Sequence, residues 1–250
     1  MNLKAWQIAL RGAAMGVAET IPGVSAGTIA FITGIYRRLI AAISAFDADL
    51  IKLILQFNYQ MVWKKIDGGF LLALIIGMIV GIGIGVFGVG YFLDHYPPVV
   101  WAFFLGLVLA SVIFIARGIK SWSIKTIFTV LFGAVMAFFI TQLPIGAVND
   151  ELWFVFLCGV VAISAMILPG ISGSFILLIL GMYQFILHDS LKDGVLKEQE
   201  PTAILTILVF GLGCILGLIF FSRILKWAFN HYENTTLAVL TGFILGSAYK

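Results

Sequence analysis

The chain has 250 residues, of which 62% are hydrophobic and 11% charged, and its mean hydropathy is +1.11. A soluble domain of this length could not bury so much apolar surface, so the composition excludes a soluble globular protein. We expect an all-α integral membrane protein with a single membrane domain over residues 1–250. The formal net charge is only +3, and we expect membrane lipids rather than nucleic acid as its partners.

The first apolar region, residues 3–40, is interrupted by Pro22 and Gly23. Proline breaks the hydrogen-bond ladder of a helix, so the region should form two half-helices that meet at a non-helical turn. The second half, Val24–Tyr36, would be about 20 Å long, which is too short to cross a bilayer. The sequence therefore predicts a re-entrant helical hairpin.

Further along the chain, residues 44–66 form a predicted insertion in which charged side chains alternate with apolar ones. We expect Ser44–Lys65 to be an amphipathic helix at the membrane interface, with a solvated linker as the alternative. Predicted spans follow at 69–93, 98–117 and 124–146. A second broken region, 150–187, contains Pro169 and Gly170. It is followed by a polar loop from His188 to Thr202, a span at 203–228, and a short apolar run at 235–250 that resembles a span whose end is short or missing.

Two parts of the sequence match each other. At an offset of 147, seven residues of the first broken region fall on identical residues of the second: Pro22, Gly23, Ser25, Ile29, Ile32, Gly34 and Tyr36 on Pro169, Gly170, Ser172, Ile176, Ile179, Gly181 and Tyr183. At an offset of 136, the match continues: Gly77, Gly81, His95, Tyr96, Gly106, Leu109 and Ser111 fall on Gly213, Gly217, His231, Tyr232, Gly242, Leu245 and Ser247. Both matches in the same order indicate a duplication. We call residues 3–117 repeat 1 and residues 150–250 repeat 2, with residues 118–149 as a connecting transmembrane helix.

The predicted topology inverts the second repeat. Three spans separate the two hairpins, and an odd number places them on opposite sides of the membrane. Twelve cationic residues then share one side, whereas the other carries Lys192, Lys197 and Lys250; the twelve are Lys4, Arg11, Arg37, Arg38, Lys52, Lys64, Lys65, Arg117, Lys120, Lys125, Arg223 and Lys226. This positive-inside bias predicts a cytoplasmic N-terminus. Inverted repeats with broken helices are typical of secondary transporters.

The broken helices suggest where a ligand binds. The half-helices that follow each Pro-Gly pair begin with backbone N–H groups that have no intrahelical partner, and an anionic oxygen can satisfy them. Nearby hydroxyls add donors, so we predict a phosphate or carboxylate cradle formed by Gly23, Ser25, Ala26, Gly27, Thr28, Gly170, Ser172, Gly173 and Ser174. The alternative is that the serines only cap their own half-helices.

Arg11 and Glu19 are ionisable residues within the first apolar region. A charged side chain there is costly, so each is a candidate functional residue. Arg11 could complement an anionic substrate, and Glu19 could carry a coupling ion, either a proton or sodium. Alternatively the two side chains neutralise each other or reach the interface.

Enzyme motifs are weak in this chain. Gly23–Gly27 matches G-x-S-x-G, but that nucleophile motif requires a preceding strand and an activating His and acid. Here a helix precedes it, and repeat 2 has Ser174 in place of the last glycine. Cys158 and Cys214 lie inside apolar runs, which favours buried hydrophobes over a disulfide or a metal site. We expect no catalytic residues, no metal and no cofactor.

The two segments MGVAETIPGVSAGTIAFITGIY (15–36) and ILPGISGSFILLILGMY (167–183) resemble the prokaryotic membrane family known as domain of unknown function 368. The resemblance covers essentially the whole chain. It implies a polyprenyl-phosphate (undecaprenyl-phosphate) translocase of the PopT type, which returns the lipid carrier to the cytoplasmic leaflet of the inner membrane for envelope polymer synthesis. Ala26 stands where the family motif commonly has glycine.

Two other functions remain open from the residues alone. A small-anion secondary transporter would have a closed site near the midplane, and a membrane scaffold or assembly protein would have no polar cavity. A lipid-phosphate transporter would instead have a polar pocket with a lateral opening to the bilayer. The sequence leaves the oligomeric state open.

Overall fold

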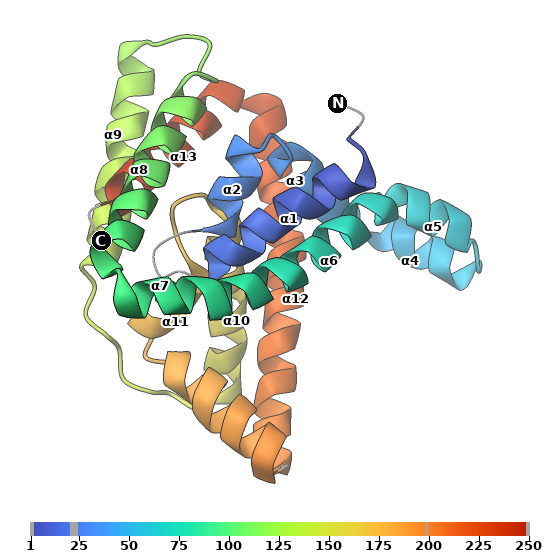
Figure 1. The fold of residues 1–250 in the computed structure, drawn as a ribbon. Helices are drawn as coiled ribbons and strands as arrows, with labels where there is room; N and C mark the ends of the chain where they lie inside the picture. Colours follow the sequence, from blue (N-terminus) through green and yellow to red (C-terminus); the bar gives the residue numbers. More distant parts are fainter. Residues whose placement is uncertain (1–2, 21–24, 199, 249–250) are drawn as a thin grey trace.

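The computed structural model describes residues 3–20, 25–198 and 200–248 (Figure 1). Within these ranges the regular secondary structure is entirely helical. The elements are α1 (Ala5–Glu19), α2 (Ala26–Ile32), α3 (Tyr36–Ser44), α4 (Ala48–Leu55), α5 (Tyr59–Lys65), α6 (Gly68–Ile84), the π-helix η1 (Gly85–Val89), α7 (Gly90–His95), α8 (Pro97–Ala116), α9 (Ile124–Thr141), α10 (Leu152–Ile167), α11 (Gly173–Ile179), the π-helix η2 (Phe185–Glu198), α12 (Pro201–His231) and α13 (Glu233–Ser247).

Four helices in the described part of the chain are long and apolar enough to cross a membrane: Gly68–Phe92, Pro97–Ala116, Ile124–Thr141 and Pro201–His231. They correspond to the four spans predicted from the sequence. The third ends at Thr141 instead of residue 146, because Pro144 cannot continue a helix and disfavours the helical conformation in the residue before it. The chain is therefore a multi-pass α-helical membrane protein.

The first broken region contains three short helices. α1 ends at Glu19, and Pro22 and Gly23 lie outside the described residues. α2 ends at Ile32, four residues earlier than the predicted half-helix, because Gly34 adopts a left-handed conformation with φ of 75° that terminates the helix. α3 then leaves at an angle of 117° to α2.

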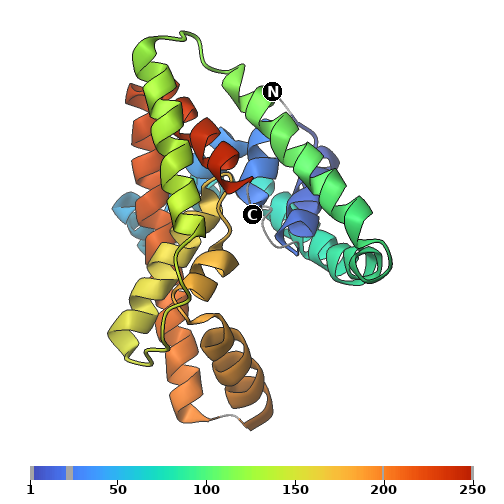
Figure 2. The same ribbon diagram turned by 90° about the vertical axis from the view of Figure 1, so that its left-hand side faces the viewer.

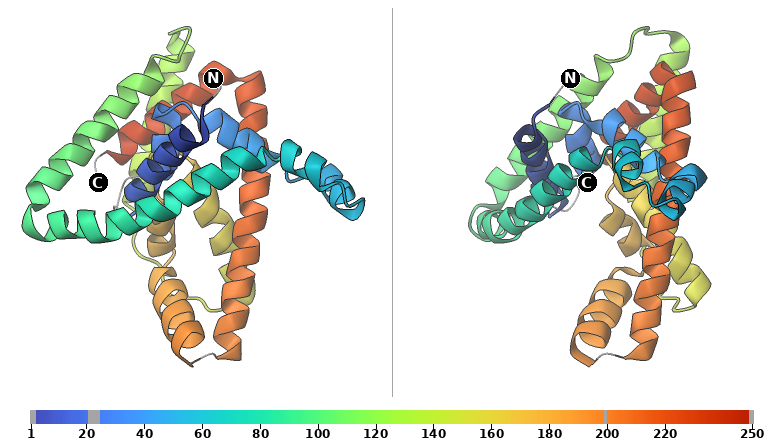
Figure 3. Two further views of the ribbon diagram at one scale, coloured as in Figure 1. Left: turned by 45° about the vertical axis from the view of Figure 1, so that its right-hand side comes forward. Right: turned by 90° about the vertical axis from the view of Figure 1, so that its right-hand side faces the viewer.

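The prediction of one continuous interfacial helix at Ser44–Lys65 is wrong, because the segment forms two helices. Two helices, α4 and α5, are joined by a turn in which Phe57 has a φ of 54° and the Asn58 side chain caps α5. A salt bridge of 2.6 Å between Lys65 Nζ and Asp47 Oδ1 closes the base of this helical pair. The pair projects from the body of the molecule (Figure 1; Figure 3, left) and exposes apolar side chains such as Leu55, which suits an interfacial position.

The predicted polar loop at His188–Thr202 is also wrong, because most of it belongs to the π-helix η2. Its buried positions explain why it is ordered as a helix: Ile186 is 1% exposed and Ser190 is 4% exposed, and η2 packs on α12. Figure 3 shows η2 and α12 side by side in the part of the molecule farthest from α8.

Glycines allow the main pairs of helices to pack closely. A Cβ atom on Gly77 of α6 would lie 2.0 Å from the Ala9 oxygen of α1, and one on Gly213 of α12 would lie 2.3 Å from the Phe156 oxygen of α10. Gly77 and Gly213 therefore lie where small residues let two helix backbones approach closely. These two contacts join residues related by the offsets of 136 and 147, so α10 packs on α12 as α1 packs on α6.

The remaining helices extend from this framework. α13 packs against both α8 and α9, which diverge from the loop that joins them (Figure 2). The larger buried cluster draws on α1, α2, α3, α6, α8, α12, α13 and the end of α10, whereas a smaller one joins α10, α11 and η2 to α12. The short, broken segments thus lie between the long helices, where their backbone ends are covered.

Candidate functional site

The break in repeat 2 brings a loop and a short helix into the middle of the protein. α10 ends at Ile167, and the chain then passes through Gly170, whose φ of 93° requires a glycine. A Cβ atom there would also lie 2.7 Å from the Ile244 Cα of α13. Ser172 is extended, with φ of −95° and ψ of 136°, and begins α11. This backbone course places the loop before α11 beside α13.

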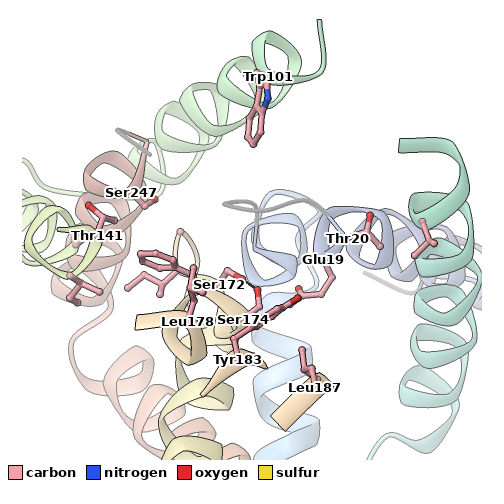
Figure 4. A pocket seen from close by; sticks show the side chains of 16 residues that line it. Glu19, Thr20, Trp101, Thr141, Ser172, Ser174, Leu178, Tyr183, Leu187 and Ser247 are labelled. Atoms are coloured by element: carbon pink, nitrogen blue, oxygen red, sulfur yellow. Dashed lines mark hydrogen bonds between the residues drawn. The ribbon is translucent and has the colours of Figure 1, made fainter. Parts of the chain in front are cut away.

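A pocket of about 560 Å³ lies next to this break (Figure 4). The end of α1, the start of α11, α8, α9 and the end of α13 all contribute to its walls. Its polar lining residues are Glu19, Thr20, Thr141, Ser172, Ser174, Tyr183 and Ser247, and its apolar ones include Val86, Trp101, Ala137, Ile140, Phe175, Leu178 and Leu187. The pocket is therefore polar in one part and apolar over most of its wall.

The polar part includes two neighbouring hydroxyls and one acid. The Ser172 and Ser174 hydroxyl oxygens lie 2.7 Å apart, and Ser172 is 8% exposed. Glu19 is the single charged side chain among the described residues that line the pocket. Its Oε2 accepts a hydrogen bond of 3.3 Å from the Ala26 amide, and the carboxyl group points toward Ser174 and Tyr183 (Figure 4). Hydroxyls can donate to an anionic oxygen, and a carboxyl group can bind or release a proton.

Ser25 and Thr28 of repeat 1 bind the backbone of repeat 2 instead of lining this pocket. The Ser25 hydroxyl accepts from the Gly27 amide at 3.1 Å and donates to the Leu168 oxygen at 3.2 Å. The Thr28 hydroxyl oxygen accepts from the Gly170 amide at 3.0 Å. Ser25 thus caps α2, as the alternative interpretation held, and also joins the two repeats.

Close packing explains the small residues at the two breaks. A Cβ atom on Gly27 would lie 2.5 Å from the Ile167 oxygen, and one on Gly173 would lie 2.7 Å from the Ala162 oxygen. Ala26 is 3% exposed. These positions hold the breaks against α10, whereas Gly23 falls outside the described residues.

Arg11 lies at the other end of α2 from Ser25. Its guanidinium donates to the Thr33 oxygen at 3.1 Å and to the Gln7 oxygen at 2.9 Å. Thr33 is the C-cap of α2, so Arg11 satisfies a carbonyl group at the end of α2, as cations near helix C-termini do. Arg11 is not part of the lining of the pocket.

Six polar or aromatic lining residues were not among the predicted site residues: Thr20, Trp101, Thr141, Phe175, Tyr183 and Ser247. Tyr183 and Ser247 belong to the repeat match, and that match was the one signal in the sequence that could have singled them out. Trp101 and Thr141 come from neighbouring spans, whose lateral arrangement has no counterpart in local sequence.

The fold and the pocket together define a multi-pass helical membrane protein with a mixed polar and apolar pocket between broken and membrane-spanning helices. The chain belongs to the VCA0040-like family of undecaprenyl phosphate translocase-like proteins, whose model matches residues 15–250. It is 39% identical over 241 residues to a polyprenyl-phosphate transporter of Vibrio cholerae, covering 96% of this chain and 75% of the relative. It is 32% identical over 260 residues to a polyprenyl-phosphate transporter of Staphylococcus aureus, covering 98% and 85%. No solved structure matches the chain.

Proposed function

We propose that this protein carries undecaprenyl phosphate, or a related polyprenyl phosphate, across the cytoplasmic membrane of a prokaryote. It returns the lipid carrier to the inner leaflet for cell-envelope polymer synthesis, and it moves the lipid without changing it covalently. The observation that carries this proposal is the pocket, which is polar in one part and apolar over most of its wall, in a chain of this family. A lipid phosphate needs both surfaces, because its headgroup is charged and its tail is hydrocarbon.

The proposed architecture is two inverted repeats, 3–117 and 150–250, joined by the connecting span within 118–149. The shared offsets of the helix contacts support the duplication, and the odd number of intervening spans supports the inversion. The excess of cationic residues on one side supports a cytoplasmic N-terminus. In this arrangement the two hairpins enter the membrane from opposite faces, as in other secondary transporters.

The phosphate headgroup is assigned to the polar end of the pocket, with the Ser172 and Ser174 hydroxyls as donors. α11 has only seven residues, and Ser172, unlike Ser25, makes no capping hydrogen bond. The assignment of the headgroup site therefore rests more on the two hydroxyls than on the dipole of so short a helix. The tail is assigned to the apolar wall that includes Trp101 of α8 and Ile140 of α9.

Glu19 is assigned to ion coupling, with a proton or sodium as the ion. An ionised carboxylate beside a phosphate is repulsive, and no basic side chain lies among the described lining residues to offset it. Protonation of Glu19 removes this repulsion. A proton is therefore the coupling ion that the pocket favours.

Direct lipid binding tests the function. The purified protein in detergent should bind undecaprenyl phosphate saturably and undecaprenol poorly. A hydrogen bond to a charged group contributes about 1.5–3 kcal/mol, so replacing Ser172 and Ser174 together by alanine should weaken binding of the phosphate lipid at least about tenfold. Ser164→Ala is the matched control, because that hydroxyl donates to the Val160 oxygen within α10 and should not affect binding.

Each outcome has a separate meaning. Failure of the unmodified protein to bind the phosphate lipid would contradict the proposed function. Normal binding by the double variant would contradict the headgroup site but leave the function intact. Full competition by inorganic phosphate at low concentration would favour a small-anion transporter.

A further inference from the structure

Residues related by the offset of 147 have unequal surroundings in this structure. Tyr36 and Ile40 of repeat 1 are each 2% exposed, and the Tyr36 hydroxyl donates to the Ile167 oxygen at 3.1 Å. Their counterparts in repeat 2, Tyr183 and Leu187, both line the pocket. Within the described residues the Tyr183 hydroxyl has no hydrogen-bond partner. The same tyrosine position is therefore closed in one repeat and open in the other.

The acceptor positions show the same inequality. Ile167, which accepts the bond from Tyr36, is the counterpart of Thr20 in repeat 1 at the offset of 147. Thr20 lines the pocket together with Tyr183. The space between Tyr183 and Thr20 is thus the open counterpart of the hydrogen bond between Tyr36 and Ile167.

The serines near the two tyrosines show the same asymmetry. On the closed side, the Ser25 hydroxyl donates across the repeat boundary to the Leu168 oxygen at 3.2 Å. On the open side, its counterpart Ser172 pairs with Ser174 of its own helix. The asymmetry therefore includes two pairs of equivalent side chains and extends over both breaks.

We propose that Tyr36 and Tyr183 form a reciprocal latch that sets which side of the protein is open. In the described conformation Tyr36 is bonded to Ile167 and the Tyr183 side is open. In the alternate conformation Tyr183 donates to the Thr20 oxygen, Tyr36 is released, and Ile40 becomes accessible as Leu187 is here. This inference rests on the proposed transport function and names the residues that govern its access states.

Pseudo-symmetry supplies the physical reason. If the two repeats exchange conformations, each state keeps one tyrosine-to-carbonyl bond across the repeat boundary and gives up the other. The two states then differ little in hydrogen bonding, as a rocking transporter requires, and a loss at either tyrosine biases the equilibrium.

The test measures the accessibility of Ile40 without any lipid. An Ile40→Cys reporter is placed in a background with Cys158→Ala and Cys214→Ala, and its labelling rate by a thiol reagent is measured in detergent. Tyr36→Phe removes the closing bond and should raise this rate about two- to tenfold, which is the range for one hydrogen bond. Tyr183→Phe weakens the alternate state and should lower the rate by a similar factor.

The second substitution is the decisive one. Loosening of the core around Tyr36 could speed labelling nearby, but it could not make a change at Tyr183 slow labelling in the other repeat. Tyr91→Phe, at an exposed ring of α7, should leave the rate unchanged. Thermal midpoints establish that each variant is folded.

An unchanged rate in the Tyr183→Phe variant, or a faster one, would overturn the latch. The outcome is separate from that of the lipid-binding test, because the labelling experiment contains no lipid. Opposite shifts in a protein that does not bind undecaprenyl phosphate would retain the latch and reject the proposed substrate. Lipid binding without opposite shifts would retain the proposed substrate and reject the latch.

Discussion

Glu19 is the residue whose surroundings most constrain the proposed transport chemistry. It ends α1, lines the pocket, and accepts a hydrogen bond from the Ala26 amide across the break. An acid in this position stabilises repeat 1 through that amide and, when ionised, opposes a phosphate in the pocket. The two roles make different predictions about pH.

Replacing Glu19 by glutamine should flatten the pH dependence of undecaprenyl phosphate binding. In the unmodified protein, binding should weaken as the pH rises and the carboxyl group ionises, whereas the neutral amide should keep binding near its low-pH level. The measurement is binding of the lipid in detergent across a pH series, with Glu151→Gln at the exposed start of α10 as the control. Identical profiles for the Glu19→Gln variant and the unmodified protein would reduce Glu19 to a structural partner of the Ala26 amide.

At the scale of helices, glycine contacts hold each broken helix to the long helix beside it. On α6, a Cβ atom on Gly77 would lie 2.0 Å from the Ala9 oxygen, whereas one on Gly83 would have no atom within 4 Å. One helix therefore carries both a tightly packed and an unconstrained glycine, which makes a matched pair for mutation.

Gly77→Ala should lower the thermal stability of the protein, because overpacking a close helix contact costs about 1–3 kcal/mol. Gly83→Ala should be neutral or gain up to about 1 kcal/mol from helix propensity. Thermal midpoints of the two variants in the same detergent provide the comparison. Equal effects at the two positions would contradict the close packing of α1 on α6.

An ion-pair cluster joins α3, the α8–α9 loop and α13. Glu233 pairs with Lys120 at 2.8 Å and also with Arg37. These hydrogen bonds, first that from Lys120 and then that from Arg37, hold the pKa of Glu233 below its ordinary value of 4.5. The cluster lies on the side where Tyr36 is closed, and its ionised form should help to hold that side together.

The stability contributed by Glu233 should be pH dependent. A carboxylate with a depressed pKa in the folded state contributes fully above the unfolded value near 4.5 and loses its contribution as the pH falls through the folded pKa. Glu233→Gln should therefore lower the thermal midpoint at neutral pH, and the difference from the unmodified protein should vanish in strong acid. Asp49→Asn is the control, because its pair with Lys52 is 70% exposed at both side chains. A difference that persists in strong acid would assign the effect to packing.

For the whole molecule, the proposed inversion of the repeats places Asp189 and Trp122 on opposite faces of the membrane. In intact cells, a cysteine substituted for Asp189 should react with an impermeant thiol reagent, and one substituted for Trp122 should react only after the cells are opened. The reverse pattern would overturn the orientation, and equal reactivity of both positions would overturn the inversion itself.

Sequence alone determined the features that depend on composition and spacing. The apolar runs identified the four spans, and the offset of 147 related the starts of α2 and α11, because lipid and the Pro-Gly breaks impose requirements on each segment by itself. Local patterns failed where a neighbouring element decided the outcome. η2 is helical because it packs on α12 and buries Ile186, and the interfacial segment turns at Phe57.

Only the tertiary structure decided which of two matching residues, one from each repeat, lines the site. Ser25 and Ser172 occupy the same position in their repeats, yet one bonds to the other repeat and the other lines the pocket. Arg11, an expected substrate ligand, holds the end of α2. The matching residues mark equivalent positions in the sequence, but the packing of the whole chain gives the two copies different surroundings, because each copy meets different neighbouring helices.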